Sequence, residues 1–290
     1  MSSNVYPFYK HSGKFGVHGP ILAAIAGLVV AFPLGILYAY LIEWIPFIYL
    51  NILITLGYGF AFGAITGFAM KYAKVRNGMV ALLSGLVVGL MAWWGNWNGC
   101  AHALVAGDAP WLFGFDELKE FIGVLYENGS WSIKSSTVSG VPLAIVWLVE
   151  GAIIVGMAAY FSYTAIARMP FCEHHQCWLN LEKTIDALAA FERPEQLAAF
   201  SAGDVSPLEA PQPREHGSGK SARVVLKYAD RCHDFFTLSV VNVTLTVDKK
   251  GKKNETEKEL MTNLKLPKPL FDQMCRLEGL AAKQWETTAA

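Results

Sequence analysis

Charged side chains are scarce in this chain. Asp, Glu, Lys and Arg together make up 17% of its 290 residues, against 53% hydrophobic residues and a mean hydropathy of +0.32. Globular domains usually carry about 25% charged residues. The composition is too apolar for an ordinary soluble domain of this length, and it excludes that class for the chain as a whole.

Recognisable catalytic motifs are also lacking. The sequence has no Gly-rich phosphate loop, no His-Glu-x-x-His run and no nucleophile elbow. His174 and His175 lie close to Cys172, as in some thiol nucleophiles, but no third residue is positioned to complete such a set. We therefore expect no catalytic residue and a protein that is not an enzyme.

Long apolar runs are confined to the first part of the chain, and none occurs after about Arg168. Each has about the 20 residues that a helix needs to cross a bilayer. Inside the runs lies a single charged residue, Glu150. This pattern predicts an all-α bundle of four transmembrane helices within residues 19–168. The four runs are residues 19–42, 46–70, 78–97 and 142–166.

Basic residues indicate how these helices are oriented. Lys71, Lys74 and Arg76 lie between the second and third runs with no acid nearby, whereas acids dominate between the third and fourth runs. Short loops rich in Lys and Arg stay in the cytoplasm. We therefore expect a cytoplasmic N-terminal tail over residues 1–18, an external segment over residues 98–140, and a cytoplasmic C-terminal part.

Small residues recur at every fourth position along these helices. This spacing places each set on one helix face, and such small-xxx-small faces let helices approach closely in lipid. The pattern predicts a tight four-helix bundle. Because four helices each carry such a face, it also favours association of several protomers or the lining of a pore. The glycines are Gly27, Gly35, Gly59, Gly63, Gly67, Gly85, Gly89 and Gly156.

Glu150 is a candidate site within the membrane. An acid buried in lipid costs several kcal/mol unless it is paired, protonated or hydrated. Asn51, at a similar depth in the second helix, is the expected partner. Two interpretations stay open, a structural hydrogen bond between helices and a group that responds to protons or cations.

The C-terminal part begins with a cluster of potential metal ligands. Two separated ligand pairs are what a structural zinc site requires, and a reducing cytoplasm favours metal over disulfide. Cys232 and His233 are adjacent, which is poor geometry for one ion, so ordinary buried thiols are the alternative. The candidate ligands are Cys172, His174, His175, Cys177, Cys232 and His233.

The same part predicts a small α+β cytoplasmic domain with an antiparallel sheet. Residues 169–202 hold the Cys/His segment and an amphipathic helix that starts near Trp178. Residues 203–221, rich in Pro, Gly, Ser and charge, read as a flexible linker. Residues 222–290 form the domain, with strands near 224–228, 235–247 and 258–266, a turn at 249–252, and a terminal helix to about Lys283.

Four short motifs carry a resemblance to a known family. They are residues 45–57, 74–77, 129–131 and 147–150. Together they resemble a family of uncharacterised bacterial inner-membrane proteins with four helices. The resemblance implies a bacterial inner-membrane location, and it implies no activity and no residue role.

These observations favour a non-enzymatic membrane anchor or assembly subunit. It would work as a homo-oligomer or membrane complex in the lipid bilayer and couple a cytoplasmic protein partner to the membrane. The alternatives are an oligomeric channel or transporter with Glu150 in the pathway, and a membrane-disrupting effector. We expect no nucleic-acid partner, and structural zinc is the one cofactor that the residues suggest.

Overall fold

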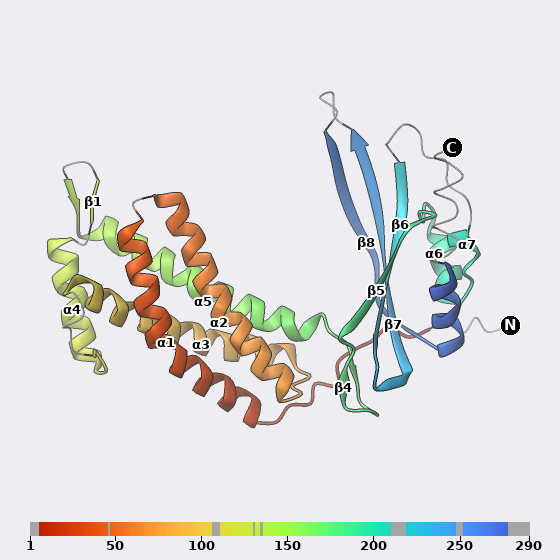
Figure 1. Ribbon diagram of the computed structural model, residues 1–290, viewed down its shortest axis with the longest axis horizontal. Coiled ribbons are helices and arrows are strands. Elements are labelled where there is room, and N and C mark those ends of the chain that lie inside the picture. Colours follow the sequence, from red (N-terminus) through yellow and green to blue (C-terminus); the bar gives the residue numbers. More distant parts are fainter. Residues whose placement is uncertain are drawn as a thin grey trace. The chain divides into compact units, whose positions relative to one another are not determined.

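The computed structural model describes residues 6–45, 47–105, 111–129, 131–133, 136–209, 219–247 and 252–277. The chain forms two compact units (Figure 1). The helical unit comprises Ser12–Arg168, and the sheet unit comprises Met1–His11 together with Met169–Ala290. The sheet unit therefore contains residues that precede the helical unit in the sequence as well as residues that follow it. The sequence predicted instead that residues 1–18 form one N-terminal tail.

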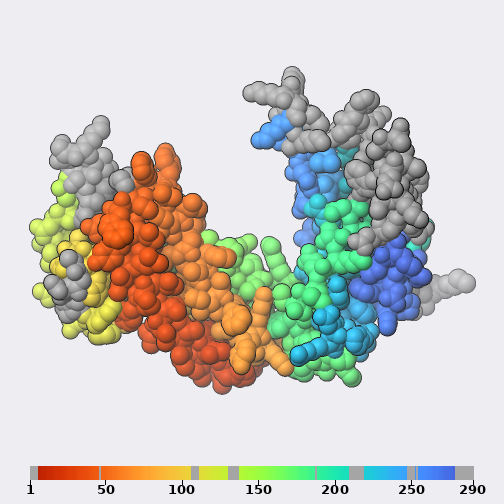
Figure 2. Space-filling model, viewed as in Figure 1, coloured from red at the N-terminus to blue at the C-terminus, as the bar shows by residue number. Residues whose placement is uncertain are grey.

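The helical unit contains four helices that are long and apolar enough to cross a membrane, so the chain is a multi-pass membrane protein. Their outward faces carry large apolar side chains such as Val29 and Phe68, as lipid requires, and Figure 2 shows the face formed by the first two. The third helix continues seven residues past the predicted end at Trp97. The helices are α1 (His18–Trp44), α2 (Ile48–Tyr72), α3 (Gly78–Leu104) and α5 (Val141–Ala167).

The glycine faces lie between helices of the same chain. A Cβ on Gly63 of α2 would lie 3.0 Å from the Ala158 carbonyl oxygen of α5, and one on Gly85 of α3 would lie 2.8 Å from the same atom. Seven of the eight predicted glycines have such a neighbour on another helix, and Gly156 faces open space. The small faces therefore account for packing within the bundle, and they no longer argue for association of protomers.

This packing predicts an asymmetric response to larger side chains. Gly63→Leu should destabilise the bundle by about 1–3 kcal/mol, because backbone at overpacked sites must shift. Gly156→Leu is the control and should leave the melting temperature of the detergent-solubilised protein unchanged. Equal melting temperatures for the two variants would contradict the assignment of Gly63 to an interface within the chain.

The segment between α3 and α5 contains α4 (Phe115–Asn128). A short antiparallel pair follows, β1 (Trp131–Ile133) and β2 (Ser136–Val138). The chain before α4 is fastened to α3, because Leu112 N donates to Asn98 Oδ1 at 2.7 Å and Trp94 Nε1 donates to Leu112 O at 3.1 Å.

The sheet unit is built on four antiparallel strands that neighbour one another in sequence order. All three predicted strands begin earlier than expected. The predicted turn at 249–252 falls largely outside the described residues. The strands are β5 (Leu181–Leu188), β6 (Gly219–Ala229), β7 (Cys232–Val247) and β8 (Lys253–Leu266).

The helix predicted from Trp178 onward was wrong, because this stretch forms β5. Burial alternates along it, with Ile185 in the core and its neighbours Thr184 and Asp186 exposed. Such a period of two belongs to a strand, and pairing of β5 with β6 provides the backbone partners. A non-local contact therefore overrides the local helical pattern.

One face of the sheet is covered by α6 (Pro194–Ser201), α7 (Ser206–Glu209) and helical residues 268–277 (Figure 1). Val205 and Leu208 are buried in this core. The prediction of a flexible linker over 203–221 was therefore wrong at both ends, because its start packs in the core and its end belongs to β6. Residues 210–218 lie outside the described part of the chain.

The N-terminal segment adds backbone to the edge of β8. Tyr9 N donates to Asn263 O at 2.8 Å, and Lys265 N donates to Pro7 O at 3.0 Å. Tyr6 N donates to Ser201 O at 2.9 Å. These bonds attach residues 6–9, which precede α1 in the sequence, to the sheet unit, whose other residues follow α5.

Candidate functional site

Two hairpins of the sheet unit hold the candidate metal ligands. The first is made of β3 (Phe171–Cys172) and β4 (Cys177–Trp178), whose register pairs Cys172 with Cys177. Its turn is closed by Gln176, which has a positive φ of 50° and whose side chain donates to Glu173 O at 2.6 Å. The second is the turn between β6 and β7, where Ala229 pairs with Cys232.

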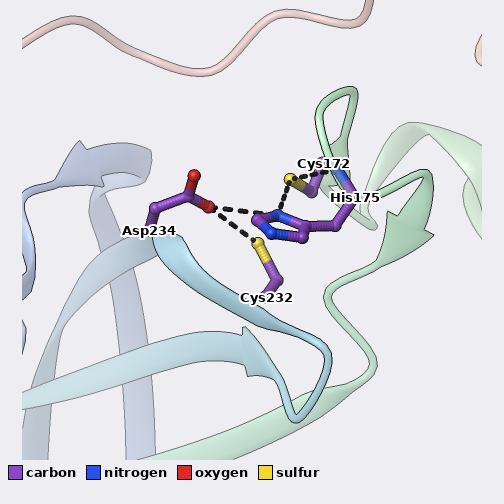
Figure 3. Close-up of side chains that lie close together, drawn as sticks. All are labelled: Cys172, His175, Cys232 and Asp234. Carbon is purple, nitrogen blue, oxygen red and sulfur yellow. Dashed lines mark hydrogen bonds and ion pairs between the residues drawn. The ribbon is translucent and has the colours of Figure 1, made fainter.

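These hairpins bring four ligand atoms together. One atom each from Cys172, His175, Cys232 and Asp234 lies within 4.8 Å of all the others (Figure 3). His175 Nδ1 is 3.5 Å from Cys172 Sγ and 3.2 Å from Asp234 Oδ1, and Cys232 Sγ is 3.5 Å from the same carboxylate oxygen.

These separations suit a tetrahedral ion. Zinc bonds of about 2.0–2.3 Å at tetrahedral angles place ligand atoms about 3.3–3.8 Å apart. The three measured separations lie at or close to this range. These three contacts would need only small adjustment around a zinc ion, and the other ligand atoms lie within 4.8 Å of one another.

The site has an apolar side and a solvent side. Cys172 and Cys232 are 3% and 1% exposed and pack with Leu179 and Ala229. The His175 and Asp234 side chains are 31% and 59% exposed. An ion would thus be held by two buried thiolates and reached from solvent past the imidazole and the carboxylate.

The buried Cys232 thiol is held in its neutral form in the absence of a cation. Burial, with the neighbouring Cys172 thiol adding to it, raises the pKa of the Cys232 thiol to about 12. A bound metal ion provides the positive charge that a thiolate needs at this position, and its binding releases the thiol proton.

The structure gathers only part of the predicted ligand set. Cys172, His175 and Cys232 converge. The His174 ring instead lies tilted against the His175 ring, with centroids 4.6 Å apart. Cys177 packs against the apolar cluster beside the thiols. His233 follows Cys232 on a strand, so its side chain leaves from the opposite face.

Sequence reasoning missed Asp234. A signal was present, because residues two apart on a strand share a face. Asp234 lies two positions after Cys232 in a segment that belongs to β7. Searching for Cys and His alone left the carboxylate out, although Asp and Glu oxygens are common zinc ligands.

Glu150 lies in a second polar cluster, in the helical unit. Tyr38 OH donates to Glu150 Oε1 at 2.5 Å, and Asn96 Nδ2 donates to the same oxygen at 3.4 Å. Among the described residues, the carboxylate has no hydrogen bond to the predicted partner Asn51. Its backbone oxygen accepts from Thr55 Oγ1 at 2.9 Å, and Thr55 in turn bonds Tyr38 at 2.8 Å.

Comparisons with protein-family models, with curated proteins and with solved structures find no match for this chain.

Proposed function

We propose that this protein is a non-enzymatic membrane anchor or assembly subunit whose sheet unit holds one structural zinc ion. It lies in the bacterial inner membrane with both termini in the cytoplasm, where the sheet unit couples a protein partner to the membrane. The convergence of Cys172, His175, Cys232 and Asp234 carries the proposal.

The donor set selects the metal. Thiolate and imidazole ligands favour zinc, whereas magnesium and calcium prefer sites made of oxygen atoms alone. Four protein ligands close a tetrahedron and leave no position for substrate, which is the arrangement of a structural site. This supports a role in folding rather than in catalysis.

The position of the site supports an anchoring role. The β3–β4 hairpin follows α5 after three residues, and the metal would fasten it to the turn between β6 and β7. The segment before α1 packs in the same place, where Phe171 N donates to Tyr9 OH at 3.1 Å and the Tyr9 ring lies 5.8 Å from that of Phe235. The metal would thus hold both chain connections to the helical unit on one sheet.

The packing of the helical unit favours an anchor over a pore. Its small faces bring helix backbones into contact within one chain, as at Gly59, where an added Cβ would lie 2.9 Å from Ile154 O. These faces are occupied, so they provide no lining for a channel between protomers. This favours the anchor over the alternative of a channel with Glu150 in the pathway.

Ion flux separates the two functions. Full-length protein reconstituted in liposomes should leave a gradient of K⁺, Na⁺ or H⁺ as stable as empty liposomes do. After mild solubilisation, the same protein should migrate in a complex that contains a second polypeptide. A flux that Glu150→Gln abolishes would overturn the anchor in favour of a transport protein.

A further inference from the structure

All four long helices contribute to one buried polar cluster around Glu150 of α5. The partners are Tyr38 of α1, Thr55 of α2 and Asn96 of α3, whose distances are given above. Tyr38, Thr55 and Asn96 are all buried. Polar side chains of all four helices therefore meet at one carboxyl group.

The carboxylate has neutral partners only. No Lys, Arg or His in the described part of the chain forms an ion pair with Glu150. Among the described residues, the other titratable groups that interact electrostatically with Glu150 include Tyr58 of α2 and Cys100 of α3, and Glu43 of α1 interacts with Cys100. An unpaired charge in a hydrocarbon-like interior is costly, so the surroundings favour the neutral acid.

The hydrogen bonds at Glu150 Oε1 also fit the neutral acid. Its proton is donated to Tyr38 OH, the Tyr38 proton is then donated to Thr55 Oγ1, and the Thr55 proton is donated to Asn51 O at the observed 2.9 Å. In the ionised form Tyr38 donates to the carboxylate instead, and Thr55 donates to Tyr38. The two forms differ in the direction of hydroxyl hydrogens and require no movement of heavy atoms.

These hydrogen bonds run from Glu150 through Tyr38 and Thr55 and end at the backbone oxygen of Asn51. Asn51 lies in the first turn of α2, next to the connection from α1. Its side-chain oxygen Oδ1 is shielded from solvent and has no hydrogen-bond partner among the described residues. A buried polar oxygen of this kind is normally satisfied by an ordered water.

We propose that Glu150 is a proton-binding site inside the bundle, neutral at pH 7, and that Tyr38 and Thr55 are its exchange path to the α1–α2 end. To load the site, a hydronium ion at Asn51 gives a proton to Thr55 Oγ1. Thr55 gives its own proton to Tyr38 OH, and Tyr38 gives its own to the Glu150 carboxylate. One proton is thereby transferred, and water remains at Asn51. This inference goes beyond the anchor and does not depend on the metal.

Infrared spectroscopy of the full-length protein in lipid nanodiscs tests the proton. At pH 7 the spectrum should contain the carbonyl stretch of a protonated carboxylic acid, shifted in D₂O and missing in Glu150→Gln. A wild-type spectrum that matches Glu150→Gln in this region would overturn the proposal, because the carboxyl group would then be ionised.

Two tyrosines test the path. Tyr38→Phe removes the hydroxyl between Glu150 and Thr55, and it should slow the D₂O shift of the carboxylic band at least tenfold. Tyr58→Phe is the matched control. Its ring stacks on Tyr38 at 4.5 Å, but its hydroxyl donates to Ala92 O at 2.9 Å and lies outside the chain. Equal exchange rates in the two variants would overturn the path through Tyr38.

Discussion

Replacing Cys172 with Ser should release zinc from the protein and strongly destabilise the sheet unit. Elemental analysis of the purified full-length protein should give about one zinc per chain on the tetrahedral assignment, and the variant should contain almost none. The melting temperature of the sheet unit should fall to that of wild-type protein treated with a chelator.

The expected size follows from linkage. An ion that binds only the folded state, at 1,000 times its dissociation constant, stabilises that state by about 4 kcal/mol. Domains of this size are stable by about 5–15 kcal/mol in total. Loss of the ion therefore removes a large share of the stability, and the β3–β4 hairpin, with two-residue strands, should be the first part to open.

Two variants test the ligand assignment itself. Asp234→Asn should weaken zinc binding in a chelator competition by more than the roughly 10–100-fold that loss of an outer-shell partner causes. Cys177→Ser should keep the metal, since Cys177 lies outside the four converging residues. If Asp234→Asn kept the metal and Cys177→Ser lost it, Cys177 rather than Asp234 would be the fourth ligand. Wild-type protein that contains no metal and melts at one temperature with and without chelator would reject zinc altogether.

The membrane helices were predictable because the bilayer fixes their length. Apolar runs of about 20 residues have one stable arrangement in lipid, and that constraint is local. The small glycine faces could also be predicted from the sequence, but the helices that they contact could not. Spacing shows that Gly63 and Gly85 lie on small faces, whereas the helix order decides that both meet α5 of the same chain.

The errors lie where non-local contacts decide the outcome. The segment around Ile185 fits an amphipathic helix and a strand about equally well in isolation, and only pairing with β6 selects the strand. Glu150 required a polar partner in any arrangement. That the partner is Tyr38 rather than Asn51 depends on how α1 is rotated against α5, which no spacing within one helix reveals.

Leu208→Ala should destabilise the sheet unit by about 2–5 kcal/mol, the usual cost of removing a fully buried leucine side chain. Leu208 is 2% exposed and packs in the cluster that includes Phe200, Leu226 and Met274. A flexible linker would tolerate the same change within about 0.5 kcal/mol. The variant therefore distinguishes the structured segment from the linker that composition suggested.

Ser206→Ala is the matched control in the same short helix, because Ser206 is exposed. It removes only a side-chain hydrogen bond to the exposed Asp204 carboxylate, and the backbone N–H that donates to Asp204 Oδ1 at 3.0 Å is retained. Urea unfolding of the full-length protein, followed by a probe in the sheet unit, measures both variants in the presence of zinc so that the metal contribution stays constant. We expect a lower midpoint for Leu208→Ala and an unchanged one for Ser206→Ala. If the two midpoints coincide with that of the wild type, residues 205–208 do not belong to the core. The sheet would then depend on α6 and residues 268–277 alone to cover this face.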